Sequence, residues 1–215
     1  MKISLIGLPG SGKTTLANIL SGMFNIMVIS SGAIARAHGF AGSDAEKKGQ
    51  LDPDERKIRR LVGEAIGDSD QYILDGFPRT IEQIEALELP LDAILYLNMI
   101  GNNGTTVAAN RLLERGRPDD TMEIIGARIA TYYTYTYPLV QYFLDREKLI
   151  YINATGTICE SLRQAVVQMA ARGIIEASQY IDQLIKEFER EYTIDPKFDK
   201  TRVHRTTGDK SQERR

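Results

Sequence analysis

The feature that most constrains the fold of this chain is the segment Gly7-Leu8-Pro9-Gly10-Ser11-Gly12-Lys13-Thr14. Its spacing is Gly-x-x-x-x-Gly-Lys-Thr, and it lies between an apolar run at residues 3–6 and a helical pattern at residues 14–23. A loop of this kind between a strand and a helix surrounds phosphate oxygens with backbone N–H groups, and the positive end of the helix adds attraction. The lysine reaches the terminal phosphates, and the hydroxyl after it contributes to Mg²⁺ binding. The sequence therefore predicts a site for a nucleoside triphosphate.

Four further short apolar runs follow the first, and they alternate with longer helical patterns. These runs are residues 26–29, 72–74, 93–97 and 149–152, and the helical patterns are residues 32–38, 53–66, 80–87, 105–115, 122–137 and 158–172. Apolar strands that alternate with helices indicate a parallel sheet covered on both faces. We therefore expect an α/β fold with three layers, the P-loop NTPase fold, built on a five-stranded parallel sheet with helices on both faces. Ligands of such sheets bind outside the carboxyl ends of the strands. Pro138 is expected to end or kink the helix before it.

The composition excludes several classes of protein. The net charge of −2 gives no general positive field for nucleic acid or anionic lipid. The single Cys159 excludes an internal disulfide and a Cys-rich zinc site. The longest apolar run, around residues 94–97, is too short to cross a bilayer, and the first predicted strand begins so early that we expect no targeting segment. We therefore expect a cytoplasmic monomer without nucleic-acid or membrane partners.

A second motif, Asp75-Gly76-Phe77-Pro78-Arg79-Thr80, follows the third predicted strand, with Gln83 three positions later. A guanidinium offers a planar fork for phosphate oxygens, and a side-chain amide can pair with a donor and an acceptor on adenine. By this motif the chain resembles the adenylate kinase family of nucleoside monophosphate kinases. The resemblance implies that Asp75 organises Mg²⁺ and its waters, with Thr14 as the other metal-site residue. It also implies that Arg79 binds the acceptor phosphate beside Gly76, and that Gln83 reads the adenine edge.

Two further segments resemble the AMP-binding part of the same family. Ser31-Gly32-x-x-x-Arg36 is similar to the family's Thr-Gly-Asp-x-x-Arg, which implies Arg36 on the AMP phosphate and the Ser31 hydroxyl near the base. Ser31 and Ala33 depart from that pattern: serine keeps the hydroxyl, whereas alanine lacks the carboxylate. Residues 49–55 are similar to Gly-x-Leu-Val-Pro-Asp-Glu and imply that Leu51 lines the acceptor pocket. The acceptor-binding segment is thus expected at residues 31–66.

Four arginines, Arg111, Arg115, Arg117 and Arg128, lie within eighteen residues of one another. Phosphoryl transfer depends mainly on positioning and on neutralising the phosphoryl oxygens, so it demands such cations. Their spacing around Asp119-Asp120 matches the family's Arg-x-Asp-Asp…Arg run. The resemblance implies that Arg111 stacks on the adenine of ATP and that the other three contact phosphates. A turn at about residues 116–121 stands where larger members carry a long, often zinc-binding lid, so a short lid without zinc is implied.

The loop Gly156-Thr157 resembles the family's loop that receives the adenine of ATP. The residues expected to bind ATP are Gly10, Ser11, Gly12, Lys13, Thr14, Thr15, Arg111 and Gly156. Those expected to bind AMP are Ser31, Arg36, Leu51, Gly76, Arg79, Gln83, Arg117 and Arg128. The expected catalytic residues are Lys13, Arg79, Arg115, Arg117 and Arg128.

These features predict the Mg²⁺-dependent reaction ATP + AMP ⇌ 2 ADP, with MgATP as the donor, in a domain at residues 1–172. Two alternatives stay open: a kinase for CMP, UMP or GMP, and a non-catalytic nucleotide-binding regulator that works through its C-terminal extension. In that extension, apolar residues at helical spacing between residues 174 and 188 predict a helix to about residue 192, before a charged tail from residue 193 to residue 215. Docking of this helix on the domain is the preferred interpretation, and binding to a partner is the alternative. The tyrosines between residues 132 and 137 are interpreted as packing residues.

Overall fold

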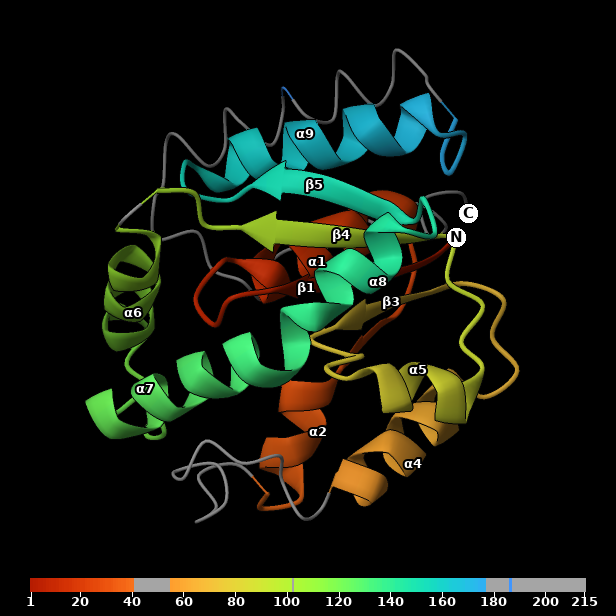
Figure 1. Ribbon diagram of the computed structural model, residues 1–215. Coiled ribbons are helices and arrows are strands. Elements are labelled where there is room, and N and C mark those ends of the chain that lie inside the picture. Colours follow the sequence, from red (N-terminus) through yellow and green to blue (C-terminus); the bar gives the residue numbers. More distant parts are fainter. Residues whose placement is uncertain (41–54, 102, 177–185, 187–215) are drawn as a thin grey trace, which may run out of the picture.

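Five parallel strands form one sheet in the order β2-β3-β1-β4-β5 in the computed structural model, which describes residues 1–40, 55–101, 103–176 and 186 (Figure 1). The strands are β1 (Lys2–Gly7), β2 (Val28–Ser30), β3 (Tyr72–Asp75), β4 (Ala93–Asn98) and β5 (Leu149–Asn153). All five lie where short apolar runs predict them. The predicted three-layer α/β fold is confirmed.

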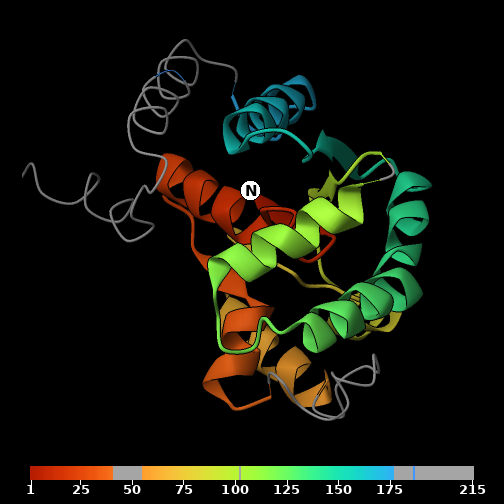
Figure 2. The same cartoon turned by 90° about the vertical axis from the view of Figure 1, so that its left-hand side faces the viewer.

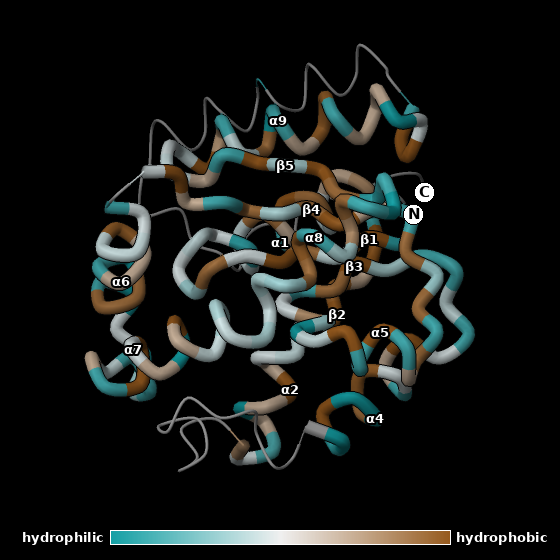
Figure 3. The backbone as a smooth tube through the Cα atoms, in the orientation of Figure 1, coloured by the Kyte–Doolittle hydropathy of each residue, from teal (hydrophilic) through white to brown (hydrophobic). Residues whose placement is uncertain are grey.

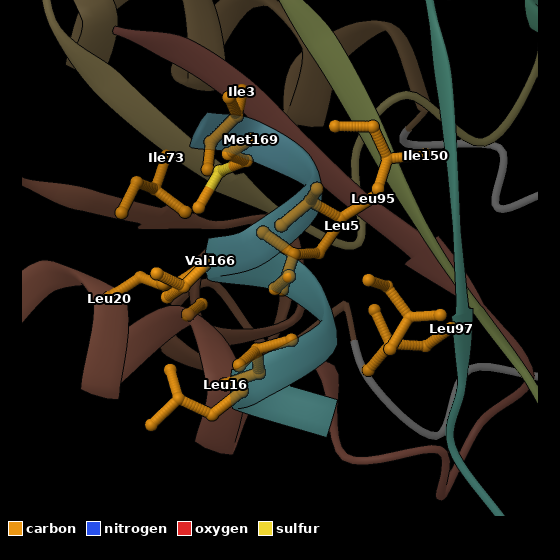
Figure 4. Packing of buried hydrophobic residues seen from close by; sticks show 14 of the residues in the cluster. Ile3, Leu5, Leu16, Leu20, Ile73, Leu95, Leu97, Ile150, Val166 and Met169 are labelled. Atoms are coloured by element: carbon orange, nitrogen blue, oxygen red, sulfur yellow. The ribbon is translucent and has the colours of Figure 1, made fainter. Parts of the chain in front are cut away.

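Helices cover both faces of the sheet, because successive side chains of each strand point to opposite sides. One face packs against α1 (Lys13–Phe24) and α9 (Ile158–Ala171). Figure 4 shows this core, where Leu5 and Leu95 of the sheet meet Leu16 of α1 and Val166 of α9. The other face packs against α8 (Pro138–Leu144) and the segment η1 (Tyr132–Thr136) that precedes it.

The remaining helices surround the ends and edges of the sheet. They are α2 (Ser31–Ala37), α4 (Glu55–Ile66), α5 (Ile81–Leu87), α6 (Gly104–Arg115) and α7 (Met122–Thr131). Hydrophobic and hydrophilic stretches alternate along α4 and α9 in Figure 3, as expected for helices with one buried face. In Figure 2 the carboxyl ends of the strands face the viewer, with α2, α6 and α7 around them.

The helix predicted over residues 122–137 consists of two parts, and Pro138 follows the second. Its first part is α7, and its last turn is η1, a π-helix in which the Tyr137 N–H donates to the carbonyl of Tyr132 at 2.8 Å. Pro138 has no N–H and its ring crowds the preceding turn, so a widened turn accommodates it. The chain then continues as α8, with Pro138 at its first turn.

The outer edge of β5 is covered by two glutamines of α9. Gln164 accepts from the Asn153 N–H at 2.9 Å and donates to the Asn153 carbonyl at 3.2 Å. Gln168 donates to the Tyr151 carbonyl at 2.7 Å. Backbone groups that point away from the sheet at this edge are thereby bound within the chain.

Part of the predicted C-terminal organisation lies outside the described residues. Ile174 and Ile175, just after α9, pack against the core between α1 and α9. The helix predicted from residue 174 does not begin there, because Ile174 and Ile175 lie in a bend. The rest of that predicted helix apart from residues 176 and 186, the charged tail and Leu51 fall beyond the described part. None of the helices in the described part of the chain has the length and apolarity that a membrane crossing needs.

Candidate functional site

The predicted phosphate loop follows β1 and opens α1, and its glycines are required by close packing. Gly7 and Gly10 have φ angles of +149° and +85°, which residues other than glycine rarely adopt. A Cβ atom at Gly7 would collide with the carbonyl of Leu97, and one at Gly10 with the carbonyl of Ala108. The loop is therefore pressed against the end of β4 on one side and against α6 on the other.

Lys13 lies half-buried under this loop. Its Nζ donates to the carbonyls of Gly7 and Leu8, both at 2.8 Å. The pKa of Lys13 is lowered to about 8, mainly by burial, with Asp75 opposing this effect and the charges of Arg79 and Arg115 adding to it. Residues far apart in the sequence thus form one electrostatic neighbourhood at the loop.

Asp75 is the last residue of β3, and its side chain connects the phosphate loop to the end of β2. Its Oδ2 accepts hydrogen bonds from Thr14 Oγ1 at 2.7 Å and from Ser30 Oγ at 2.9 Å. Ser30 ends β2 and is the partner of Asp75 in the parallel register. Sequence analysis missed Ser30, although a serine between a strand and a helix is a recognisable N-cap signal.

The residues Asp75 and Thr14 fit a hydrated Mg²⁺ ion. Within the described part of the chain, the side chain of Asp75 accepts hydrogen bonds only at Oδ2. Its other oxygen, Oδ1, has no such partner and keeps some contact with solvent. A carboxylate oxygen that accepts no protein hydrogen bond and is not fully enclosed suits a cation that keeps several of its waters. No described group of three or more His, Cys, Asp or Glu could hold a metal ion.

The motif after β3 brings the predicted acceptor residues together. Ser31 Oγ donates to the Gly76 carbonyl at 2.8 Å, and Arg79 Nε donates to the same carbonyl at 3.1 Å. The backbone N–H of Arg79 donates to Gln83 Oε1 at 2.6 Å, which fixes the orientation of this amide. Thr80 caps α5 by accepting from the N–H of Gln83 at 3.3 Å. The turn therefore holds the guanidinium of Arg79 beside the buried amide of Gln83.

The arginines of α6 and α7 are held by two aspartates between these helices. Arg115 makes two hydrogen bonds to Asp120, from Nε at 2.8 Å and from Nη2 at 2.7 Å. Arg128 donates to Asp120 at 3.1 Å and to Asp119 at 2.6 Å. The side chain of Asp120 is fully buried, whereas both arginines keep part of their surface exposed. Asp120 therefore anchors two guanidinium groups, a role that sequence analysis did not assign to it.

Arg117 and Arg36 add positive charge beside this cluster. Burial lowers the pKa of Arg117, and the charges of Arg115 and Arg36 lower it further, against the effect of Asp120 and Asp119. Burial by itself raises the pKa of Asp119, but the hydrogen bond and charge of Arg128 outweigh it and hold that pKa below its usual value. The cations of the α6–α7 connection and of α2 are thus near enough to repel one another.

These interactions join six cations and three carboxylates into one site. The cations are Lys13, Arg36, Arg79, Arg115, Arg117 and Arg128, and the carboxylates are Asp75, Asp119 and Asp120. Six cations against three carboxylates leave an excess of positive charge, which favours a strongly anionic ligand. The site therefore suits more than one phosphate chain.

Two of the residues predicted for ATP lie together at a neighbouring position, after β5. Arg111 donates to the carbonyls of Ala154 at 3.0 Å, Thr155 at 3.1 Å and Gly156 at 3.0 Å. A guanidinium bound along its edge can still stack through its flat face. Thr15 is half-buried on α1 and makes no side-chain hydrogen bond in the described part of the chain.

Comparison with known proteins gives one consistent result. Residues 5–148 match the family described as Adenylate kinase. The adenylate kinase of Prochlorococcus marinus (strain AS9601) is 35% identical over 176 residues, which cover 74% of this chain and 94% of that protein. The adenylate kinase of Corynebacterium urealyticum is 34% identical over 183 residues, with coverage of 78% and 97%. That of Oenococcus oeni is 36% identical over 174 residues, with coverage of 73% and 90%.

Proposed function

The chain belongs to the adenylate kinase family and is a nucleoside monophosphate kinase, and we propose that the site at the carboxyl ends of β1, β2 and β3 transfers the terminal phosphoryl group of ATP to AMP. The observation that carries this assignment is the meeting of two motifs on Asp75. Thr14 from the phosphate loop and Ser30 before α2 both donate to its Oδ2. A donor site and an acceptor site are therefore in contact.

The donor half of the site holds the triphosphate. The N–H groups of the loop and Lys13 bind its phosphate oxygens, while Arg111 supports the loop at Gly156 that receives the adenine. Thr14 and Asp75 would hold Mg²⁺ largely through its waters. When bound, Mg²⁺ neutralises charge on the β- and γ-phosphoryl oxygens.

The acceptor half places the AMP phosphate in line with the transferred group. Arg36 and Arg79 bind that phosphate, and Gln83 together with Ser31 orients the base. An oxygen of AMP attacks the γ-phosphorus, and the bond between this phosphorus and the β–γ bridging oxygen breaks, which leaves two ADP molecules. Arg115, Arg117 and Arg128 neutralise the charge on the phosphoryl oxygens during transfer. Closure of the short lid over residues 116–121 would exclude water, which would otherwise hydrolyse ATP.

The domain that carries this chemistry is residues 1–172, with the acceptor-binding segment at residues 31–66. We propose that the chain acts as a monomer, because the donor and acceptor motifs meet within it at Asp75. A cytoplasmic location stays a prediction, as does the absence of nucleic-acid partners, which the net charge of −2 supports.

An assay of ATP-dependent turnover with AMP, CMP, UMP and GMP tests the assignment. We expect AMP to be the preferred acceptor. Preferred turnover of CMP or UMP would contradict the AMP assignment, and no turnover with any acceptor would favour a non-catalytic regulator.

The same assay on Arg79→Ala tests the acceptor half. We expect kcat/KM for AMP to fall on the order of a hundredfold, because a charge-assisted contact with phosphate is lost, while the Kd for ATP changes little. Arg146→Ala is the matched control, since Arg146 stacks on Tyr142 at the exposed end of α8. An equal loss of ATP binding and AMP use in Arg79→Ala would show that this residue is misplaced.

A further inference from the structure

Ser30 occupies the junction between β2 and the acceptor helix α2. It is the last residue of β2 and the N-cap of α2, where its Oγ accepts from the Ala33 N–H at 3.4 Å. In the sheet it is paired with Asp75 of the neighbouring parallel strand. Paired residues of neighbouring strands point to the same face, so the register itself brings the hydroxyl to the carboxylate.

Two hydroxyls hold the same oxygen of Asp75. Ser30 donates to Oδ2 at 2.9 Å, and Thr14 donates to it at 2.7 Å. One of these hydroxyls belongs to the acceptor side of the site and the other to the phosphate loop. A carboxylate held by one hydroxyl can rotate about its last side-chain bond, whereas two donors from different elements restrict that rotation. Oδ1, which accepts no hydrogen bond in the described part, is thereby kept in one orientation.

Among the three carboxylates of the site in the described part of the chain, Asp75 differs from the other two because it is not bound to an arginine. Position 33 is alanine, and Asp119 and Asp120 are bound to Arg128 and Arg115. The orientation of a single carboxylate therefore decides how well hydrated Mg²⁺ is held at the donor phosphates.

We propose that Ser30 is a positioning residue, which orients Asp75 for the hydrated metal and links the position of the acceptor helix α2 to the metal site of the donor. The proposal rests on the proposed function, because it uses the metal role of Asp75. It makes Ser30 a residue of the phosphoryl-transfer site that neither touches a nucleotide nor binds the metal directly.

Two variants separate this role from helix capping. Ser30→Gly removes the hydroxyl, but glycine is tolerated as an N-cap with a loss of only a few tenths of a kcal/mol. Ser30→Thr keeps both the cap and a hydroxyl that can donate to Asp75. Thermal unfolding of both variants verifies that the fold is retained.

The first readout is binding rather than activity. Calorimetry measures the affinity for a non-hydrolysable ATP analogue in excess Mg²⁺ and again in EDTA, and the ratio of the two affinities isolates the contribution of the metal. We expect this ratio to fall about fivefold in Ser30→Gly, because one hydrogen bond to a charged group is lost. The affinity in EDTA should stay within about twofold of wild type, and Ser30→Thr should restore the ratio.

The second readout is the free Mg²⁺ concentration for half-maximal kcat at saturating ATP and AMP, which should rise about fivefold in Ser30→Gly. An unchanged ratio of affinities, or an equal loss of affinity with and without Mg²⁺, would overturn the proposal.

The wild-type acceptor assay separates the two possible failures. If wild type turns over AMP while Ser30→Gly keeps its affinity ratio, the role of Ser30 is wrong and the function stands. If wild type uses no acceptor but Ser30→Gly loses its affinity ratio, the function is wrong and the positioning role stands.

Discussion

Lys13 shows how a single residue can be prepared for a ligand. Its ammonium group is bound by two loop carbonyls and lies near the charges of Arg79 and Arg115. Burial and these cations destabilise the charged form, and the carbonyls do not neutralise it. In the proposed complex, phosphate oxygens of the nucleotide would supply the negative charge that the site lacks, so binding would stabilise the ammonium form.

The pKa of Lys13 predicts how ATP use depends on pH. In the free protein Lys13 is charged below about pH 8 and loses its proton as the pH rises through this value. Because kcat/KM reports groups of the free enzyme, kcat/KM for ATP should decline above about pH 8. In the ternary complex the bound phosphates raise this pKa, so kcat should decline only at higher pH.

Steady-state rates between about pH 6 and pH 10 measure both profiles, a range that includes the usual lysine value near 10.4. A kcat/KM for ATP that stays constant to about pH 9.5 would show that Lys13 keeps its proton in the free protein.

At the scale of elements, the connection between α6 and α7 is organised by the paired aspartates. Asp120 is buried and binds arginines from both helices, whereas Asp119 binds Arg128 alone. Arginines of both helices thus bind the same carboxylate, that of Asp120. The arginines that would contact the transferred phosphate are therefore oriented before the nucleotides bind. Pre-orientation of this kind lowers the cost of reorganisation during catalysis.

Replacing each aspartate in turn tests this arrangement. Asp120→Asn leaves two guanidinium groups without their shared carboxylate, so we expect kcat to fall on the order of tenfold to a hundredfold. The free energy of unfolding should fall by about 2 kcal/mol, less than for a wholly buried pair because both arginines are partly exposed.

Asp119→Asn is the matched control, with the same chemical change and one arginine affected. Its kcat and its free energy of unfolding, from urea denaturation, should change less. Equal effects of the two substitutions would contradict the anchoring role of Asp120.

Local patterns were sufficient to predict the elements, but contacts between elements were not. The phosphate loop and the strands follow from runs of neighbouring residues, so the sequence predicts them well. The pairing of Ser30 with Asp75 joins residues 45 positions apart and depends on strand order and register. The anchoring role of Asp120 likewise depends on how α6 and α7 approach each other. Pro138 predicts a break, yet periodicity does not reveal that a π-helix absorbs it.

At the scale of the whole molecule, the hydrophobic core extends beyond the predicted domain end at residue 172. Ile174 and Ile175 pack against the cluster between α1 and α9, and the Ile174 N–H donates to the Met169 carbonyl at 3.0 Å. All site residues in the described part precede these two isoleucines. Stability and catalysis should therefore respond differently to shortening of the chain.

Two truncations test this expectation. A chain ending at residue 176 keeps both isoleucines and should retain the kcat of the full chain, because it contains every residue assigned to the site. A chain ending at residue 172 should lose about 2 kcal/mol of unfolding free energy, since two partly buried isoleucines no longer cover the core. Urea denaturation and the AMP assay measure the two effects. Equal stability of the two chains would show that these residues add nothing to the core.

The glutamines of α9 have a consequence for how the molecule behaves among its own copies. An open strand edge is a template on which another chain can add a strand, which leads to aggregation or exchange of segments. At β5, a newcomer would have to displace Gln164 from Asn153 and Gln168 from Tyr151 before it could form its own hydrogen bonds. Each glutamine hydrogen bond that is lost offsets one hydrogen bond that the added strand would form. Adding a strand at this edge therefore gains little free energy. The helix that completes the core also keeps this edge of the sheet closed to further strands.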